Sequence, residues 1–334
     1  MWGGWSRGGE DSPVATPRLA SLRLVGADGG PLYVDVRTGA RPGEVRPTVV
    51  IGHGFKGFKH WGFFPCLAER LGLAGFTAIT FNFSGSGVGP DSEVVDEPDR
   101  WFRQTLSNDL ADLDTVIGHV AEAAPPWIGL VGHSRGGGTT VIQAARDARV
   151  RALVTWAAVA GFSRYSTAEL VRWRREGRIE VVNARTGQVL PMGTVSLDDL
   201  EENGRGPLDV LAAAARIRVP WLIVHGTADE SVASSEAEQL AGASGSARTE
   251  LLLLDGAGHT FGARHPWAGS TPDLDEVMKE TAKFLSGTLG LAGHGVRSGN
   301  VSGPDAIGPG PRGLLVDERN QNPAARSPSK PLSR

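Results

Sequence analysis

At Trp127-Ile-Gly-Leu-Val131-Gly132-His133-Ser134-Arg135-Gly136, an apolar run leads directly into a serine flanked by glycines. The run indicates a buried strand. The residues after it match G-x-S-x-G, a sharp turn from strand to helix that holds the serine in a strained conformation with its hydroxyl above a sheet. Glycines two residues before and after Ser134 leave room for such a turn. Because short motifs also occur by chance, the rest of the chain has to decide what Ser134 does.

Short apolar segments alternate with helical patterns on both sides of this turn. We expect an antiparallel hairpin from 22–25 and 32–36, and further strands at 48–51, 76–81, 152–156, 221–224 and 251–254. Helices are expected at about 61–71, 101–124 and 274–286, where apolar residues recur at helical spacing. This alternation predicts an α/β fold, with a mostly parallel central sheet and helices on both faces. The carboxyl ends of the parallel strands then meet at one edge, where ligands bind.

Three polar residues suited to one reaction each follow a predicted strand. Ser134 follows the strand that ends at Val131, Asp229 follows the strand 221–224, and His259 follows the strand 251–254. A serine hydroxyl becomes a nucleophile when a neutral imidazole accepts its proton, and a carboxylate orients that imidazole. We therefore predict Ser134 as the nucleophile, His259 as the base and Asp229 as the orienting acid.

Each of these assignments has a competitor in the sequence. Ser134 as an ordinary helix N-cap is the plain structural interpretation. Asp229 is favoured by its position one turn beyond the strand, and His259 by the loop Gly256-Ala-Gly258 that precedes it. The competing acids are Glu230 and Asp255, and the competing bases are His225 and His265.

The order Ser134, Asp229, His259, each beyond a strand, resembles the α/β-hydrolase fold, in which the triad occurs in this order. The resemblance spans roughly residues 20–287. Two segments, His53-Gly-Phe-Lys-Gly-Phe-Lys-His-Trp61 and His225-Gly-Thr-Ala-Asp-Glu-Ser-Val232, are similar to the dienelactone-hydrolase and acyl-aminopeptidase-like branch. The chain departs from many members at Asn82-Phe-Ser-Gly-Ser-Gly87, where Asn82 and Ser84 replace the charged pair of D-x-R-G-x-G.

A serine hydrolase also needs donors for the negative charge that develops on the carbonyl oxygen. We expect the backbone N–H groups of Phe55 and Arg135 to supply them. Of the other pocket candidates, His53 is expected to brace the turn before Phe55 and His133 to pack beside the nucleophile. Two pairs keep two interpretations each: His60 and Trp61 either line the pocket or cap the next helix, and Phe162 and Trp173 either form pocket walls or anchor a cap.

The predicted domain organisation is a hydrolase domain over 18–287, with a cap insertion at about 161–215 and disordered tails at 1–17 and 288–334. Ser166-Thr-Ala-Glu169 is a capping box that opens a cap helix ending before Gly177, and 179–182 with 188–190 form a hairpin. The cap also carries a group of arginines, which either attract a substrate anion or form a solvated face paired with glutamates. They are Arg172, Arg174, Arg175 and Arg178.

Composition narrows the classes of partner. The formal net charge is −3 with no dense basic stripe, so no nucleic-acid partner is expected. A single cysteine, Cys66, and the absence of a signal peptide or long apolar run predict a cytoplasmic protein without a membrane partner. No nucleotide-binding motif or metal-ligand spacing occurs, so neither a cofactor nor a metal is expected. The oligomeric state stays open.

The function predicted from the sequence is hydrolysis of a small-molecule carboxylic ester through an acyl-enzyme intermediate. The alternative within enzymes is an aminopeptidase or acyl-peptide hydrolase, which acts on a peptide substrate with the same three residues. The second alternative is a non-catalytic binding protein that retains the fold, because fold alone does not fix function.

Overall fold

The computed structural model describes residues 16–292. The predicted disordered tails lie outside the described residues, except for 16, 17 and 288–292. The last helix includes 288–292, so the ordered chain continues past the predicted boundary at 287. The strands are β1 (Arg18–Val25), β2 (Pro31–Thr38), β3 (Thr48–Gly52), β4 (Thr77–Phe81), β5 (Ile128–His133), β6 (Val150–Trp156), β7 (Arg178–Asn183), β8 (Gln188–Gly193), β9 (Trp221–Gly226) and β10 (Thr249–Leu254). The helices are α1 (Phe64–Leu73), the 3₁₀ turn η1 (Ser84–Ser86), α2 (Pro98–Phe102), α3 (Leu106–Glu122), α4 (Arg135–Arg146), α5 (Thr167–Glu176), α6 (Thr194–Asn203), α7 (Val210–Ala214), α8 (Ser234–Ala243) and α9 (Pro272–Ala292).

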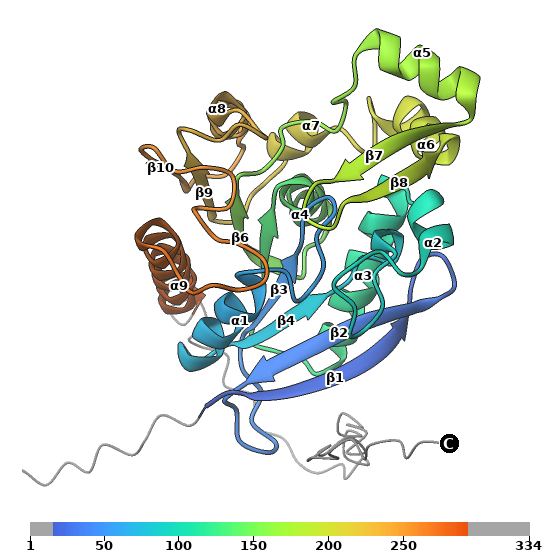
Figure 1. The fold of residues 1–334 in the computed structure, drawn as a ribbon. Coiled ribbons are helices and arrows are strands. Elements are labelled where there is room, and N and C mark those ends of the chain that lie inside the picture. The colour runs from blue at the N-terminus through green and yellow to red at the C-terminus, as the bar shows by residue number, and fades with distance from the viewer. Residues whose placement is uncertain (1–15, 293–334) are drawn as a thin grey trace, which may run out of the picture.

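Eight strands form one sheet in the order β1-β2-β4-β3-β5-β6-β9-β10 (Figure 1). The pairs β1-β2 and β2-β4 are antiparallel, and every other neighbouring pair is parallel. The predicted opening hairpin is confirmed, with Leu22 opposite Val34. The inner strands β3 and β5 are buried along their whole length, which is why their sequences are apolar without alternation. The predicted α/β fold with a mostly parallel sheet is confirmed.

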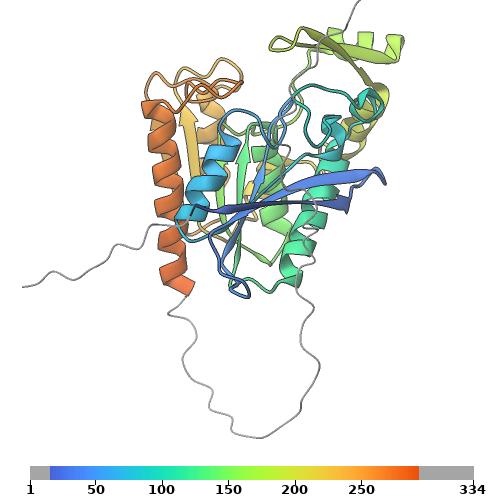
Figure 2. The same ribbon diagram turned by 60° about the horizontal axis from the view of Figure 1, so that its bottom comes forward.

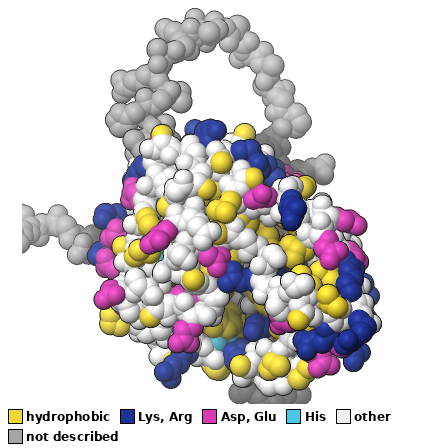
Figure 3. Space-filling view, turned by 90° about the horizontal axis from the view of Figure 1, so that it is seen from above, with side chains coloured by type: hydrophobic (Ala, Val, Ile, Leu, Met, Phe, Trp, Pro, Cys, Tyr) yellow, Lys and Arg dark blue, Asp and Glu magenta, His cyan; other side chains and the backbone are white. Residues whose placement is uncertain are grey.

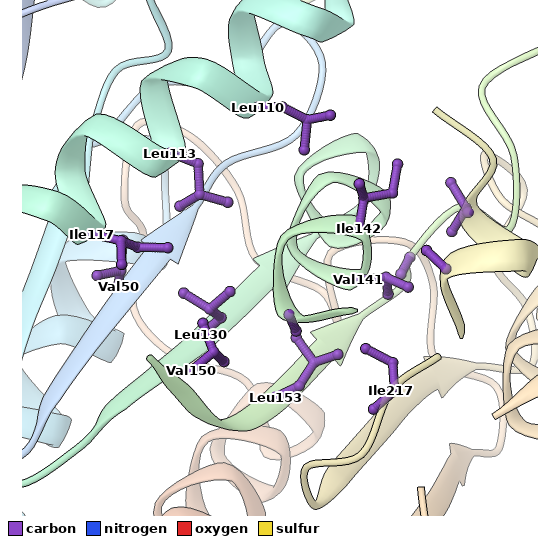
Figure 4. Close-up of a cluster of buried hydrophobic side chains, with 14 of the residues drawn as sticks. Val50, Leu110, Leu113, Ile117, Leu130, Val141, Ile142, Val150, Leu153 and Ile217 are labelled. Carbon is purple, nitrogen blue, oxygen red and sulfur yellow. The ribbon is translucent and has the colours of Figure 1, made fainter. Parts of the chain in front are cut away.

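Helices cover both faces of the sheet. On one face α1 and α9 contact each other and share a buried apolar cluster with β3, β5, β6 and β9 (Figure 2). The other face is covered by α3, α4, α7 and α8. Figure 4 shows Leu113 and Ile117 of α3 close to Val50 and Leu130 of the sheet. This double cover fixes the sheet as a rigid platform for the loops at its edge.

The predicted helix at 101–124 is wrong in one respect, because the chain forms two helices there. Helix α2 ends at Phe102, and α3 begins at Leu106. Thr105 lies between them in an extended conformation, and its hydroxyl accepts a hydrogen bond from the N–H of Asn108 at 3.1 Å. This N-cap satisfies a backbone donor at the start of α3 and so starts a new helix where the apolar spacing alone predicts continuity.

The cap consists of α5, the hairpin β7-β8 and α6 (Figure 1). Helix α5 has the predicted capping box between Ser166 and Glu169, and it ends at Gly177 with φ of 73°. The hairpin β7-β8 is separate from the large sheet. The cap joins the rest of the molecule through contacts of β8 with α2 and of α6 with α3. Helix α7, also within the predicted range 161–215, packs on α4 instead.

Candidate active site

Ser134 stands between β5 and α4 with φ of 56° and ψ of −121°, outside the conformations that a serine prefers. Its N–H donates to the carbonyl of Trp156 at 2.9 Å, and its own carbonyl accepts the N–H of Gly137 at 2.9 Å. A Cβ on Gly136 would lie 2.3 Å from the carbonyl oxygen of His53, so only glycine fits there. The turn is therefore held from several directions while the serine hydroxyl points away from the sheet's end.

The structure brings the three predicted residues into one hydrogen-bonded row. Nε2 of His259 lies 3.1 Å from Oγ of Ser134, and Nδ1 of His259 lies 2.8 Å from Oδ2 of Asp229. The other carboxylate oxygen of Asp229 accepts the N–H groups of Ser231 at 2.8 Å and Val232 at 2.9 Å. This row can move a proton from the serine hydroxyl to an imidazole that a carboxylate orients.

The carboxylate of Asp229 is buried yet remains charged. Its burial acts to raise its pKa, but hydrogen bonds from His225, His259 and the N–H of Val232 outweigh the burial, and the pKa of this carboxyl lies well below its usual value. A charged Asp229 favours the imidazole tautomer whose Nδ1 carries hydrogen, which leaves Nε2 free to accept a proton from Ser134.

His225 has a place that the sequence did not indicate. Its side chain is fully buried, and Nε2 lies 2.9 Å from the carbonyl oxygen of Val232 and 3.2 Å from Oδ2 of Asp229. Nδ1 of His225 has no hydrogen-bond partner within the described residues. Nε2 donates to the carbonyl of Val232, and Oδ2 of Asp229 is a second, longer contact of the same N–H. His225 supports the acid of the row rather than acting as the base.

The other competitors for these roles lie outside the row. Asp255 accepts a hydrogen bond from the hydroxyl of Thr227 at 3.1 Å. Nδ1 of His265 accepts the N–H of Gly62 at 2.9 Å. The side chain of Glu230 is exposed. None of the three has a hydrogen bond to His259 or Ser134 among the described contacts.

Two further histidines support the loops around Ser134. Nε2 of His133 lies 3.0 Å from the carbonyl oxygen of His259, and burial lowers the pKa of His133 to about 3, so the neutral ring donates this hydrogen bond. His53 is likewise neutral, because burial lowers its pKa to about 4. Its Nδ1 donates to the carbonyl of Gly54 at 2.9 Å, and its Nε2 accepts the N–H of Phe83 at 3.1 Å.

The turn at Gly54 and Phe55 lies directly against Ser134. A Cβ on Gly54 would be 2.9 Å from Cβ of Ser134, so this close approach needs glycine. Within the described residues, the N–H groups of Phe55 and Arg135 have no recorded acceptor. The two predicted donors therefore belong to segments that meet at the serine, and both are available to an oxygen bound there.

The side chain of Arg135 turns away toward α3. Its Nη2 lies 3.1 Å from Oδ2 of Asp109, its Nη1 donates to Gln104 at 2.8 Å, and its guanidinium lies 4.7 Å from the centre of the Phe55 ring. Burial raises the pKa of Asp109 to about 7, although the positive charge of Arg135 opposes this rise. Arg135 and Asp109 interact by electrostatic attraction alone, because neither oxygen of Asp109 accepts an aligned hydrogen bond in the described residues.

A cavity of about 420 Å³ opens beside Ser134 and His259. Trp61 and His133 line it, as predicted. Phe55 and Phe64 add aromatic wall, and none of the lining residues is acidic. A larger hollow of about 570 Å³ lies among Trp127, Arg146 and Pro220 and contains none of the predicted site residues.

Four predicted pocket residues do not line this cavity. Nε2 of His60 instead lies 2.6 Å from Oδ2 of Asp35, a buried carboxylate on β2. His60 therefore does not line the cavity. Phe162 packs on the core beside α4, and Trp173 is buried in the cap's own apolar cluster. His53 lies beneath the turn that it braces.

Comparison with known proteins agrees with this geometry. A family model described as serine aminopeptidase, S33, matches residues 43–195. An uncharacterized 31.7 kDa protein from the traX-finO intergenic region of Escherichia coli is 28% identical over 204 residues, which cover 58% of this chain and 68% of that protein. A putative hydrolase from Agrobacterium vitis S4 has a TM-score of 0.61 at 22% identity, covering 81% of this chain and 99% of its own. Est1E from Butyrivibrio proteoclasticus, solved with ferulic acid bound, has a TM-score of 0.59 at 19% identity, covering 80% of this chain and 99% of its own.

The chain has the α/β-hydrolase fold. The fold expected from the resemblance is thereby confirmed. Membership of the dienelactone-hydrolase and acyl-aminopeptidase-like branch stays a prediction.

Three of the cap arginines pair with acidic side chains and do not line the cavity. Arg174 contacts Asp198 and Glu201 of α6, which ties α5 to α6. Arg175 pairs with Glu176 at 2.7 Å, and Arg178 lies 3.9 Å from Glu180. The interpretation as a solvated, paired face is therefore the better one for these three arginines.

The sequence analysis did not single out the cations that do line the cavity. They are Lys56, Arg185 and Arg264, which come from the turn after Phe55, the β7-β8 turn and the loop after His259. Their sequence separation left no pattern that groups them.

In the described range 16–292, no helix has the length and apolarity needed to cross a membrane. Nor do these residues contain a group of three or more side chains placed to bind a metal ion.

Proposed function

We propose that the protein is a serine hydrolase that cleaves carboxylic esters, with Ser134 as its nucleophile. The observation that carries the proposal is the row from Asp229 through His259 to Ser134, with separations of 2.8 and 3.1 Å. The α/β-hydrolase fold and the match to a family of serine aminopeptidases support hydrolase chemistry. The same row has no evident purpose in a non-catalytic binding protein.

The proposed reaction begins when Oγ of Ser134 bonds to the carbonyl carbon of the ester. The hydroxyl proton passes to Nε2 of His259, and the carbonyl π electrons move onto the oxygen. That oxygen accepts hydrogen bonds from the N–H groups of Phe55 and Arg135. His259 then gives its proton to the alcohol oxygen as the carbon–oxygen bond breaks, and the acyl group stays on Ser134. Water, deprotonated by His259, releases the acid in the second half of the cycle.

Amide cleavage is the second candidate, because the matching family model describes aminopeptidases. An aminopeptidase has to bind the positively charged amino terminus of its substrate, which calls for an acidic side chain near the reacting serine. None of the described residues that line the cavity is acidic. Ester hydrolysis therefore fits the cavity better than aminopeptidase activity.

A fluorophosphonate probe tests the nucleophile directly, because it forms a covalent bond with an activated serine. We expect peptide mass spectrometry to locate the adduct on Ser134 in the folded protein, and we expect Ser134→Ala to abolish it. His259→Ala should lose nearly all turnover of p-nitrophenyl acetate, whereas His119→Ala, on the surface of α3, should retain it. An unlabelled Ser134 in folded protein would refute the enzymatic assignment. Faster cleavage of aminoacyl anilides than of p-nitrophenyl esters would replace the ester assignment with the amide one.

A further inference from the structure

The cavity beside Ser134 carries an excess of positive charge. Lys56, Arg185 and Arg264 line it, and none of the three has an ion pair within the described residues. The cap arginines Arg174 and Arg175, by contrast, both have acidic partners. The cations at the cavity are thus distinguished from others nearby by lacking a counter-charge of their own.

Arg185 is the most firmly placed of the three. It projects from the turn between β7 and β8, donates a hydrogen bond to the backbone carbonyl of Glu93, and lies over the ring of Phe58 at 5.4 Å. Its side chain is half-buried, and burial lowers its pKa although the charge of Glu93 opposes this. A cation that is partly dehydrated and has no ion pair of its own gains from an anionic ligand.

The other two cations enclose the cavity from different sides. Lys56 directly follows Phe55 and has φ of 60°, and its Nζ lies 3.4 Å from the carbonyl of Val182 in the cap. Arg264 is exposed in the loop that follows His259. The positive charges therefore come from the main domain and from the cap, and they line the same cavity as Ser134. Figure 3 views this side of the molecule from above and shows Lys and Arg side chains around a hollow in which a histidine is visible.

Acidic groups near the cavity do not cancel this charge. Asp229 is already shared between His225 and His259. The carboxylate of Glu93 attracts Arg185 and lies 3.2 Å from Nε2 of His265, but it is 56% exposed, so solvent screens its charge. Part of the remaining wall is aromatic, from Phe55, Trp61 and Phe64.

We propose that the substrate is an anionic ester, in which a carboxylate a short distance from the scissile carbonyl is bound by Lys56, Arg185 and Arg264. The apolar part between the two groups lies against the aromatic wall. This inference depends on the proposed function of Ser134, and it names the substrate class of that site. The charge acts on binding and orientation, and it adds no chemical step to the reaction.

The test compares two esters that differ only in charge, p-nitrophenyl hydrogen adipate and p-nitrophenyl methyl adipate. We expect a higher kcat/KM for the ester with the free carboxylate. That preference should shrink as NaCl is raised from about 10 mM to about 1 M, because the Debye length falls from about 30 Å to about 3 Å. Equal kcat/KM values, or a preference that salt does not change, would overturn the proposal while leaving ester hydrolysis intact.

Substitutions test which arginines bind the substrate carboxylate. The double variant Arg185→Gln with Arg264→Gln should reduce the ratio of the two kcat/KM values by about tenfold, an effect expected for charges a few ångströms apart at a partly exposed site. Lys56 is left in place because its left-handed backbone lies next to a proposed oxyanion donor. Arg175→Gln, which removes a cap arginine outside the cavity, is the matched control and should leave the ratio unchanged. An equal fall of the ratio in both variants would reject the cavity as the anion site.

A binding measurement separates this proposal from the proposed function. Calorimetry on Ser134→Ala compares monomethyl adipate, which carries one carboxylate, with dimethyl adipate, which carries none. Tighter binding of the monomethyl ester supports the anion site even if the native protein hydrolyses neither p-nitrophenyl ester. Equal or weaker binding overturns it, whatever the fluorophosphonate result at Ser134.

Discussion

Nε2 of His225 lies 3.2 Å from Oδ2 of Asp229, the same oxygen that lies 2.8 Å from Nδ1 of His259. One carboxylate oxygen thus faces two imidazoles, one fully buried and one next to the cavity. The N–H of His225 draws on the charge of this oxygen, so less negative charge acts on His259.

The first prediction concerns Asp229 itself. Asp229→Asn should lower kcat by about ten-thousandfold, because an amide at this position favours the imidazole tautomer that cannot accept the proton of Ser134. Steady-state kinetics on p-nitrophenyl acetate measures the loss. Asp255→Asn is the control, since Asp255 contacts only Thr227 among the described side chains, and it should retain activity. Full activity in Asp229→Asn would mean that another group orients His259.

The second prediction concerns His225. His225→Leu keeps most of the buried volume but removes a donor to Asp229, so the lowered pKa of Asp229 should rise. With one donor fewer, the Asp229 carboxylate attracts the protonated imidazole of His259 more strongly, so the acid limb of the kcat/KM profile should move to higher pH. A pH series of kcat/KM for native and variant protein measures the move. A purely structural role for His225 would give the same fractional loss of activity at every pH.

The third prediction tests the close packing beneath Ser134. Gly136→Ala places a Cβ 2.3 Å from the carbonyl oxygen of His53, so we expect the free energy of unfolding to fall by about 1–3 kcal/mol, the range for overpacked sites. Urea denaturation followed by circular dichroism measures it. Gly161→Ala, where a Cβ has no neighbour within 4 Å, should be nearly neutral. Similar effects of the two substitutions would contradict the packing argument.

The fourth prediction follows from Asp109, whose pKa is raised to about 7 in the fold from its ordinary 3.8. Its folded form prefers the proton, so its contribution to stability is fully present below the unfolded pKa and is lost as pH rises through about 7. Native protein should therefore lose more unfolding free energy between about pH 5 and about pH 8 than Asp109→Asn, by about 1.4 kcal/mol for each pH unit between pH 5 and the folded pKa of about 7. Urea denaturation at both pH values tests this. The exposed Asp99→Asn should keep the native pH dependence, and the same slope in Asp109→Asn would count against a raised pKa.

Much of the framework could be predicted because its signals are local. A parallel strand covered on both faces needs a continuous apolar run, and β3, β5 and β9 have such runs. Ser134, Asp229 and His259 each follow a strand, so the common direction of the strands was enough to predict that they meet. The break at Thr105 escaped this reasoning, because a single hydroxyl decides it within an otherwise helical pattern. The helices α6, α7 and α8 were not predicted either.

The cavity was harder to predict because its residues are related only in three dimensions. His60 has the residue type of a pocket ligand, yet Asp35 on a distant strand holds it. The arginines of α5 form the denser cluster in the sequence, but α6 supplies the carboxylates that engage Arg174. Arg185 stands alone in a turn, and only the position of the cap brings it to the cavity.

The cap has an apolar cluster of its own, built from Trp173, Ile179, Met192 and Leu197. The reacting groups, by contrast, all come from loops at the edge of the large sheet. The exposed turn that bears Arg185 can therefore vary in sequence while Ser134 keeps its place, so one sheet can serve different substrates.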